Sequence, residues 1–112
     1  IILAGYLRLI PSEIIKSFKN KIFNIHPSLL PKFGGKGFYG HHVHNSVLDS
    51  KEKKSGITIH LVNEIYDGGR VLFQESTPVY DHDDIHSLSS RIHDLEYKYY
   101  PLIIEKYLLN QL

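Results

Sequence analysis

Two runs rich in β-branched residues constrain the fold of this chain more than any other feature. "GITIHLVNE" covers residues 56–64, and "RVLFQESTPV" covers residues 70–79. Between them lies "YDGG", in which Asp-Gly accepts the positive φ angles of a type I′ turn. We therefore expect two strands joined by a tight connection.

Shorter segments complete a mixture of strands and helices. Residues 1–7 form an apolar run suited to a buried strand, and residues 21–27, "KIFNIHP", read as another strand. Between them Pro11-Ser12 predicts the N-cap of a brief helix. The apolar face of that helix consists of Ile14, Ile15 and Phe18.

Two further helices are expected. One covers residues 41–49 and packs through Val43, Val47 and Leu48. The other is amphipathic, because apolar residues recur at spacings of three and four. Those residues are Ile85, Leu88, Ile92, Leu95 and Tyr99. We expect Pro101 to kink or break this helix. Strands mixed with helices indicate an α/β layer fold.

Composition excludes several classes of function. The chain has 112 residues, enough for one small domain, and its net charge of +1 predicts no strong attraction to nucleic acid or anionic membrane. No apolar run is long enough to span a membrane. Cysteine is absent, which excludes thiolate nucleophiles and fits a reducing, cytoplasmic environment.

The segment "NIHPSLLP" places two polar side chains in a strand. Residues two apart point to the same face, so Asn24 and His26 should project side by side. Pro27 holds His26 extended at the strand end. Asp67 taken alone is better explained as a turn residue. Near His26, however, its carboxylate would orient the ring, while Asn24 could donate to an oxyanion, and the three would make an acyl-transfer site.

The glycine-rich stretch 31–40 contains a literal G-x-G-x-x-G at Gly35, Gly37 and Gly40. A dinucleotide-binding motif needs strand, glycine turn and helix in immediate succession, and the prolines after the strand interrupt that order. We therefore expect a surface loop that can cover a ligand.

Histidines suggest a second class of function. His41 and His44 lie three apart on the predicted helix and could share a metal with His26 or His60. Since there is neither cysteine nor an H-E-x-x-H arrangement, we expect no metal, although a histidine-rich metal-binding module stays an alternative. His60, inside a strand, is better explained as a buried, hydrogen-bonded residue.

Three separated motifs carry a family resemblance. With "LAGYLRLIP" before it and "VNEIYDGG" after it, "NIHPSLLP" resembles the phosphoribosylglycinamide formyltransferase family of purine synthesis. The likeness runs over essentially all of residues 1–112 and implies a Rossmann-like α/β fold, with a mostly parallel sheet flanked by helices. It corresponds to the carboxyl-terminal part of a single formyltransferase domain. Without an initiator methionine, the chain is expected to be a fragment that lacks the first strands and the family's phosphate-binding loop, and so to bind glycinamide ribonucleotide poorly by itself.

The resemblance also implies the activity and the site. Members transfer the formyl group of 10-formyltetrahydrofolate, as co-substrate, to the amine of glycinamide ribonucleotide. The catalytic Asn, His and Asp fall on Asn24, His26 and Asp67. The residues implied for folate are Arg8, Leu9, Ile10, Ile22, Asn63, Glu64 and Asp67. Those implied for the ribonucleotide are Gly5, Ile25, Pro27 and Glu96.

Other readings remain open at this point. Formyltetrahydrofolate hydrolase and methionyl-tRNA formyltransferase share the Asn, His and Asp arrangement, but Pro27 and "YDGG" favour the purine enzyme. A degenerate fragment with a structural role is a third alternative. His93 stands where the family pattern predicts a longer polar side chain, so its role is open, as are those of His41, His42 and His44. The oligomeric state is not indicated.

Overall fold

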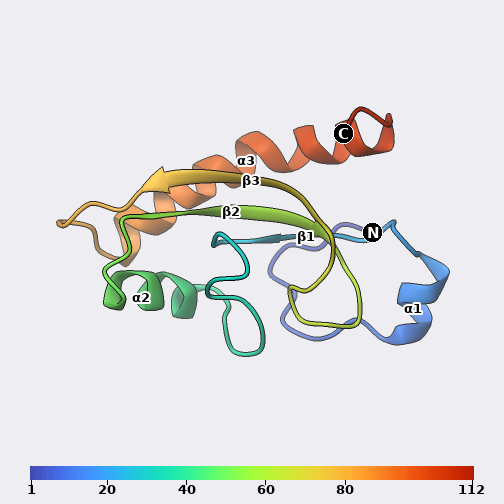
Figure 1. Ribbon diagram of the computed structural model, residues 1–112, viewed down its shortest axis with the longest axis horizontal. Helices are drawn as coiled ribbons and strands as arrows, with labels where there is room; N and C mark the ends of the chain where they lie inside the picture. The colour runs from blue at the N-terminus through green and yellow to red at the C-terminus, as the bar shows by residue number, and fades with distance from the viewer.

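A computed structural model describes all of residues 1–112 as one sheet with helices around it (Figure 1). The three strands are β1 (Phe23–His26), β2 (Lys54–Leu61) and β3 (Val71–Pro78), in the order β1-β2-β3. The helices are α1 (Ser12–Ser17), α2 (His41–Asp49) and α3 (Ile85–Leu108). In Figure 1, α1 and α2 lie at opposite ends of the molecule, and α3 runs along the sheet.

All three strands pair antiparallel, so the predicted mostly parallel sheet is wrong for these strands. Asn24 pairs with His60 across β1 and β2, and Ile59 pairs with Phe73 across β2 and β3. Strands that follow one another through a direct connection, as β2 and β3 do, can pair only antiparallel. The sole parallel contact is an isolated bridge between Ile2 and Phe23.

The two faces of β2 have different environments. Ile57 and Ile59 are fully buried in a core that Val43 and Val47 of α2 and Leu88 and Ile92 of α3 complete. Thr58 and His60 point to the other face, since successive residues of a strand alternate, and they are buried as well. The second face is therefore covered too, and it is the polar one.

The start of the chain differs from its predicted structure. Residues 1–7 form no strand beyond the bridge at Ile2, whose side chain is 59% exposed. The helix α1 begins after Pro11 rather than Ser12, has no side-chain cap and buries none of its residues. Most of these apolar side chains stay exposed, so the sequence pattern alone does not produce a buried element.

The helix α3 continues through Pro101, so the predicted break is wrong. A proline inside a helix leaves the carbonyl four residues earlier without its partner, and here that residue is Tyr97. The side chain of Tyr97 is 77% exposed, so water can reach this turn. At the other end, Asp84 and Ser87 form a capping box that fixes where α3 begins.

The connection between β2 and β3 is longer than the tight turn predicted from "YDGG". It runs from residue 62 to residue 70 and contains a turn closed by the Gly68 N–H and the Ile65 carbonyl. Asp67 has φ 53°, in the left-handed region that Asp tolerates better than most residues. We call residues 62–70 the Asp67 loop.

Substituting Leu88 by alanine should lower the free energy of unfolding by about 2–5 kcal/mol, because it leaves a cavity in a fully buried site. Leu108→Ala makes the same substitution on the same helix, at a residue that is 65% exposed, and should have little effect on the free energy of unfolding. Denaturant titration of both variants measures the difference. Equal losses would show that the core does not lie under α3.

None of the helices combines the length and the apolar character needed to cross a bilayer.

Candidate active site

The largest cavity, about 590 Å³, lies beside β1, the edge strand of the sheet. Its walls come from the segment after residue 3, from β1, from the glycine-rich loop and from the helices α2 and α3. Six of its lining residues carry amide, imidazole or carboxylate side chains: Asn24, His26, His44, Asp67, His93 and Glu96. All three predicted catalytic residues are thus placed in one cavity.

His26 lies between the glycine-rich loop and Asp67. Its Nε2 is 2.7 Å from the carbonyl oxygen of Phe33, so this nitrogen carries the proton and donates it. Its Nδ1 lies 3.5 Å from Asp67 Oδ2. Burial lowers the pKa of His26, and the Phe33 carbonyl and the Asp67 carboxylate only partly offset this effect. The resting imidazole is therefore neutral, with its free nitrogen facing a carboxylate.

Asp67 is ionised at neutral pH. Burial raises the pKa of its carboxyl group, but the neighbouring His60 ring and the hydrogen bond from the Gly35 N–H lower it further. The Gly35 N–H donates to Asp67 Oδ2 at 2.9 Å. The glycine-rich loop is therefore bonded to both His26 and Asp67 through its own backbone.

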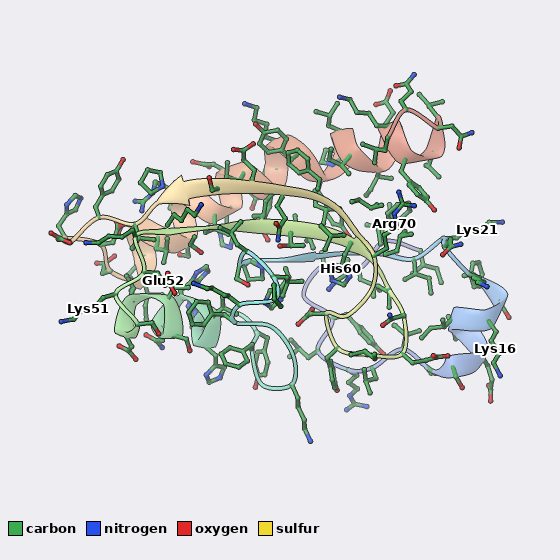
Figure 2. All side chains as sticks on the ribbon, viewed as in Figure 1. Lys16, Lys21, Lys51, Glu52, His60 and Arg70 are labelled. Atoms are coloured by element: carbon green, nitrogen blue, oxygen red, sulfur yellow. The ribbon has the colours of Figure 1, made fainter.

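Asn24 is oriented by His60. His60 Nδ1 donates to the carbonyl of Leu61 at 2.8 Å, so its Nε2 is an acceptor when the ring is neutral. Asn24 Nδ2 lies 3.3 Å from that Nε2 and donates to it. One amide N–H of Asn24 stays free. Figure 2 labels His60 near the end of β2 from which the Asp67 loop departs, and its Nε2 is 3.7 Å from Asp67 Oδ1.

The chain after His26 is fixed by Thr58, on the polar face of β2. The Thr58 hydroxyl donates to the carbonyl of Ser28 at 2.7 Å and accepts from the Leu30 N–H at 3.0 Å. Gln74 of β3 donates both to this hydroxyl and to the Leu30 carbonyl. This buried network holds the backbone beyond Pro27 against the sheet and so supports the position of His26.

A second, smaller cavity of about 40 Å³ adjoins the first. Four residues line both cavities: Tyr6, Asn24, Tyr66 and Asp67. Most residues predicted to contact folate lie here, namely Arg8, Leu9, Ile10, Asn63 and Asp67. Ile22 is 1% exposed and Glu64 is exposed, and neither lines either cavity.

The four residues predicted for the ribonucleotide, Gly5, Ile25, Pro27 and Glu96, all line the large cavity. Burial raises the pKa of Glu96, and the nearby charge of His93 opposes this only in part. His93 Nε2 lies 3.8 Å from Glu96 Oε1. Glu96 is thus a half-buried acceptor on the helix wall, at a place where a hydroxyl group could bind.

Sequence reasoning gave too little weight to two histidines. His60 is buried and hydrogen-bonded as expected, but it also contacts Asn24 and Asp67. Its position two residues after Thr58 places it on the polar face of β2, and this spacing could have indicated its contacts with the site residues. His44 is buried rather than exposed, whereas His41 and His42 are exposed. The structure contains no group of three or more side chains placed to hold a metal ion.

The antiparallel sheet, its helices and the two connected cavities make this an α/β domain with a small-molecule site at a sheet edge. A family model described as "Formyl transferase" matches residues 1–104, and the chain belongs to this family.

Three of the proteins to which the chain is similar are named phosphoribosylglycinamide formyltransferase. The chain is 50% identical over 105 residues to the chloroplastic phosphoribosylglycinamide formyltransferase of Vigna unguiculata, covering 94% of this chain and 34% of that protein. It is 41% identical over 108 residues to the phosphoribosylglycinamide formyltransferase of Bacillus subtilis, covering 96% of this chain and 53% of that protein. The crystal structure of phosphoribosylglycinamide formyltransferase from Bacillus halodurans superposes with a TM-score of 0.86 at 34% identity, over 96% of this chain and 53% of that one. The chain thus spans between a third and about half of the length of these relatives.

Proposed function

We propose that this chain carries the formyl-transfer site of an enzyme that moves the formyl group of 10-formyltetrahydrofolate to the amine of glycinamide ribonucleotide, a step of purine biosynthesis. The names of the relatives support the activity. The observation that carries the proposal is that Asn24, His26 and Asp67 all line the large cavity, and that Asn24 and Asp67 line the small one as well. Two substrates bound in connected cavities would bring their reacting atoms together there.

The reaction begins when the amine of the acceptor attacks the formyl carbon. A carbon–nitrogen bond forms, and the formyl oxygen becomes an oxyanion. The free N–H of Asn24 donates to that oxyanion, as does the Nε2–H of His26. The added amine loses a proton to Asp67, directly or through water. The oxyanion then re-forms the formyl carbonyl, and the bond between the formyl carbon and the folate nitrogen breaks. That nitrogen leaves with the proton that Asp67 had received from the amine.

The resting geometry defines what His26 has to do. Its Nε2–H is bonded to Phe33 O, so the oxyanion must replace that carbonyl as acceptor. The proton that Asp67 receives from the amine can pass to Nδ1 of His26, 3.5 Å away, and the imidazolium then faces an ionised Asp67. The oxyanion and the Asp67 carboxylate together stabilise this imidazolium, whereas burial keeps the ring neutral before the oxyanion forms.

The two substrates bind at different parts of the site. The pterin end of folate binds beside Arg8 and Asn63, where the small cavity provides only part of the space that it needs, and the ribonucleotide binds in the large cavity. Glu96 accepts hydrogen bonds from the ribose hydroxyls. Both partners are small molecules, and the net charge of +1 gives no reason to propose nucleic acid. The mechanism needs no metal. We propose the cytoplasm as its location.

The test is formyl transfer by the intact protein, measured with and without glycinamide ribonucleotide. Product formation that requires the amine is expected. Release of formate at the same rate without the amine would favour a hydrolase, and formylation of methionyl-tRNA would favour the tRNA enzyme. Either result would overturn the proposal.

A further inference from the structure

His44 is a buried polar residue of the large cavity that the proposed reaction does not use. It lies in α2, is 3% exposed and lines the cavity wall. Its Nδ1 is buried and has no hydrogen-bond partner in the protein. Buried polar groups are nearly always paired, so an imidazole that lines a cavity without such a partner can receive one from a ligand.

The charge state of His44 limits what that partner can be. Burial, and then the charges of His93, His41 and His26, lower the pKa of His44 to about 4. The ring is thus neutral at physiological pH and offers one N–H donor and one lone pair. Such a group fits an uncharged polar partner, such as an amide or a hydroxyl, better than an ion.

The position of His44 narrows the choice further. It lines the same cavity as His26, at which the amine reacts, and Glu96, which accepts from the ribose. An acceptor that extends from its reacting amine at His26 to its ribose at Glu96 has an amide between these two groups.

We propose that His44 binds the acceptor substrate by a hydrogen bond to the uncharged amide that joins its amine to its sugar. This inference rests on the proposed function. It makes His44 a substrate-binding residue that selects for that amide, with no part in proton transfer.

The variant His44→Leu tests this in the intact protein. The KM for glycinamide ribonucleotide should rise about tenfold, as expected for one lost hydrogen bond, while the KM for formyl folate stays unchanged. The thermal midpoint without ligand should stay the same or rise, because an unpaired buried polar group is replaced by an apolar one. His41→Leu makes the same change at an exposed position of α2 and should leave both KM values unchanged. A purely structural His44 predicts the reverse: a lower midpoint and an unchanged KM for the ribonucleotide.

A binding measurement separates this inference from the proposed function. The imidazole NMR signals of His44, assigned by their loss in His44→Leu, should shift when glycinamide ribonucleotide is added, and less when ribose 5-phosphate, which lacks the amide, is added. Equal shifts, or none, would overturn the inference. A shift with glycinamide ribonucleotide in a protein that transfers no formyl group would support the contact and overturn the proposed function alone. Formyl transfer by a protein in which the His44 signals do not shift and the KM is unchanged in His44→Leu would support the proposed function and overturn the inference about His44. If the ribonucleotide did not bind at all, both the inference and the proposed function would be overturned.

Discussion

Replacing His26 by alanine is expected to lower the turnover of formyl transfer by about a hundredfold or more, as losing one oxyanion donor commonly does. The Asn24 amide would remain as a donor, and Asp67 would lose the ring that it orients. Steady-state rates with both substrates saturating measure the effect. Binding of the ribonucleotide should change much less than turnover, because the donated hydrogen bond forms fully only in the transition state.

The matched control is His42→Ala. This histidine is exposed on α2 and does not line either cavity. It should leave turnover unchanged. Circular dichroism of both variants checks that they are folded. If folded His26→Ala protein kept full turnover, the mechanism would be wrong.

Replacing Gly69 by alanine should destabilise the fold by about 3 kcal/mol or more, because the added methyl group has no space. A Cβ at this position would lie 1.6 Å from the carbonyl oxygen of Leu61 and 2.6 Å from its carbon, and these are backbone atoms. The clash can be relieved only by moving the Asp67 loop away from β2. Denaturant titration should show the lower stability, and calorimetry should show weaker binding of formyl folate.

Gly37→Ala is the control for this second prediction. No atom lies within 4 Å of a Cβ there, but Gly37 has φ 87°. The expected loss is therefore the strain of a left-handed backbone alone, about 1–2 kcal/mol. Losses of the same size at the two glycines would contradict the packing argument for Gly69.

The local elements were largely predictable from the sequence, because side-chain periodicity determines them. The helix α2 runs over the predicted residues 41–49, and the two β-branched runs became β2 and β3. The antiparallel pairing of β2 with β3 follows from their direct connection, but the direction in which β1 pairs with β2 was not predictable, since period-two alternation is the same in parallel and antiparallel strands. The buried strand predicted for residues 1–7 is absent for a related reason: an apolar run is buried only where another layer covers it, and Ile2 stays exposed.

The candidate site was predictable to the extent that it depends on side chains within one element. Asn24 and His26 share a face because they are two residues apart in β1, and this is a local rule. The approach of Asp67 follows from tertiary structure and was expected from the motif order of the family. The hydrogen bonds that the Phe33 carbonyl and the Gly35 N–H make in the site could not be predicted from the sequence, since every residue except proline carries both backbone groups.

The bonds that the glycine-rich loop makes to His26 and Asp67 have a consequence for any measured affinity. The Phe33 carbonyl accepts a hydrogen bond from His26, and the Gly35 N–H donates one to Asp67. The reacting groups would need these same positions on His26 and Asp67, so substrates can bind there only by replacing the loop's hydrogen bonds. Because the loop belongs to the same chain, it is an intramolecular competitor with a high effective concentration. Dissociation constants will therefore understate the strength of the contacts at His26, and variants that shorten or loosen the loop can bind more tightly while reacting no faster.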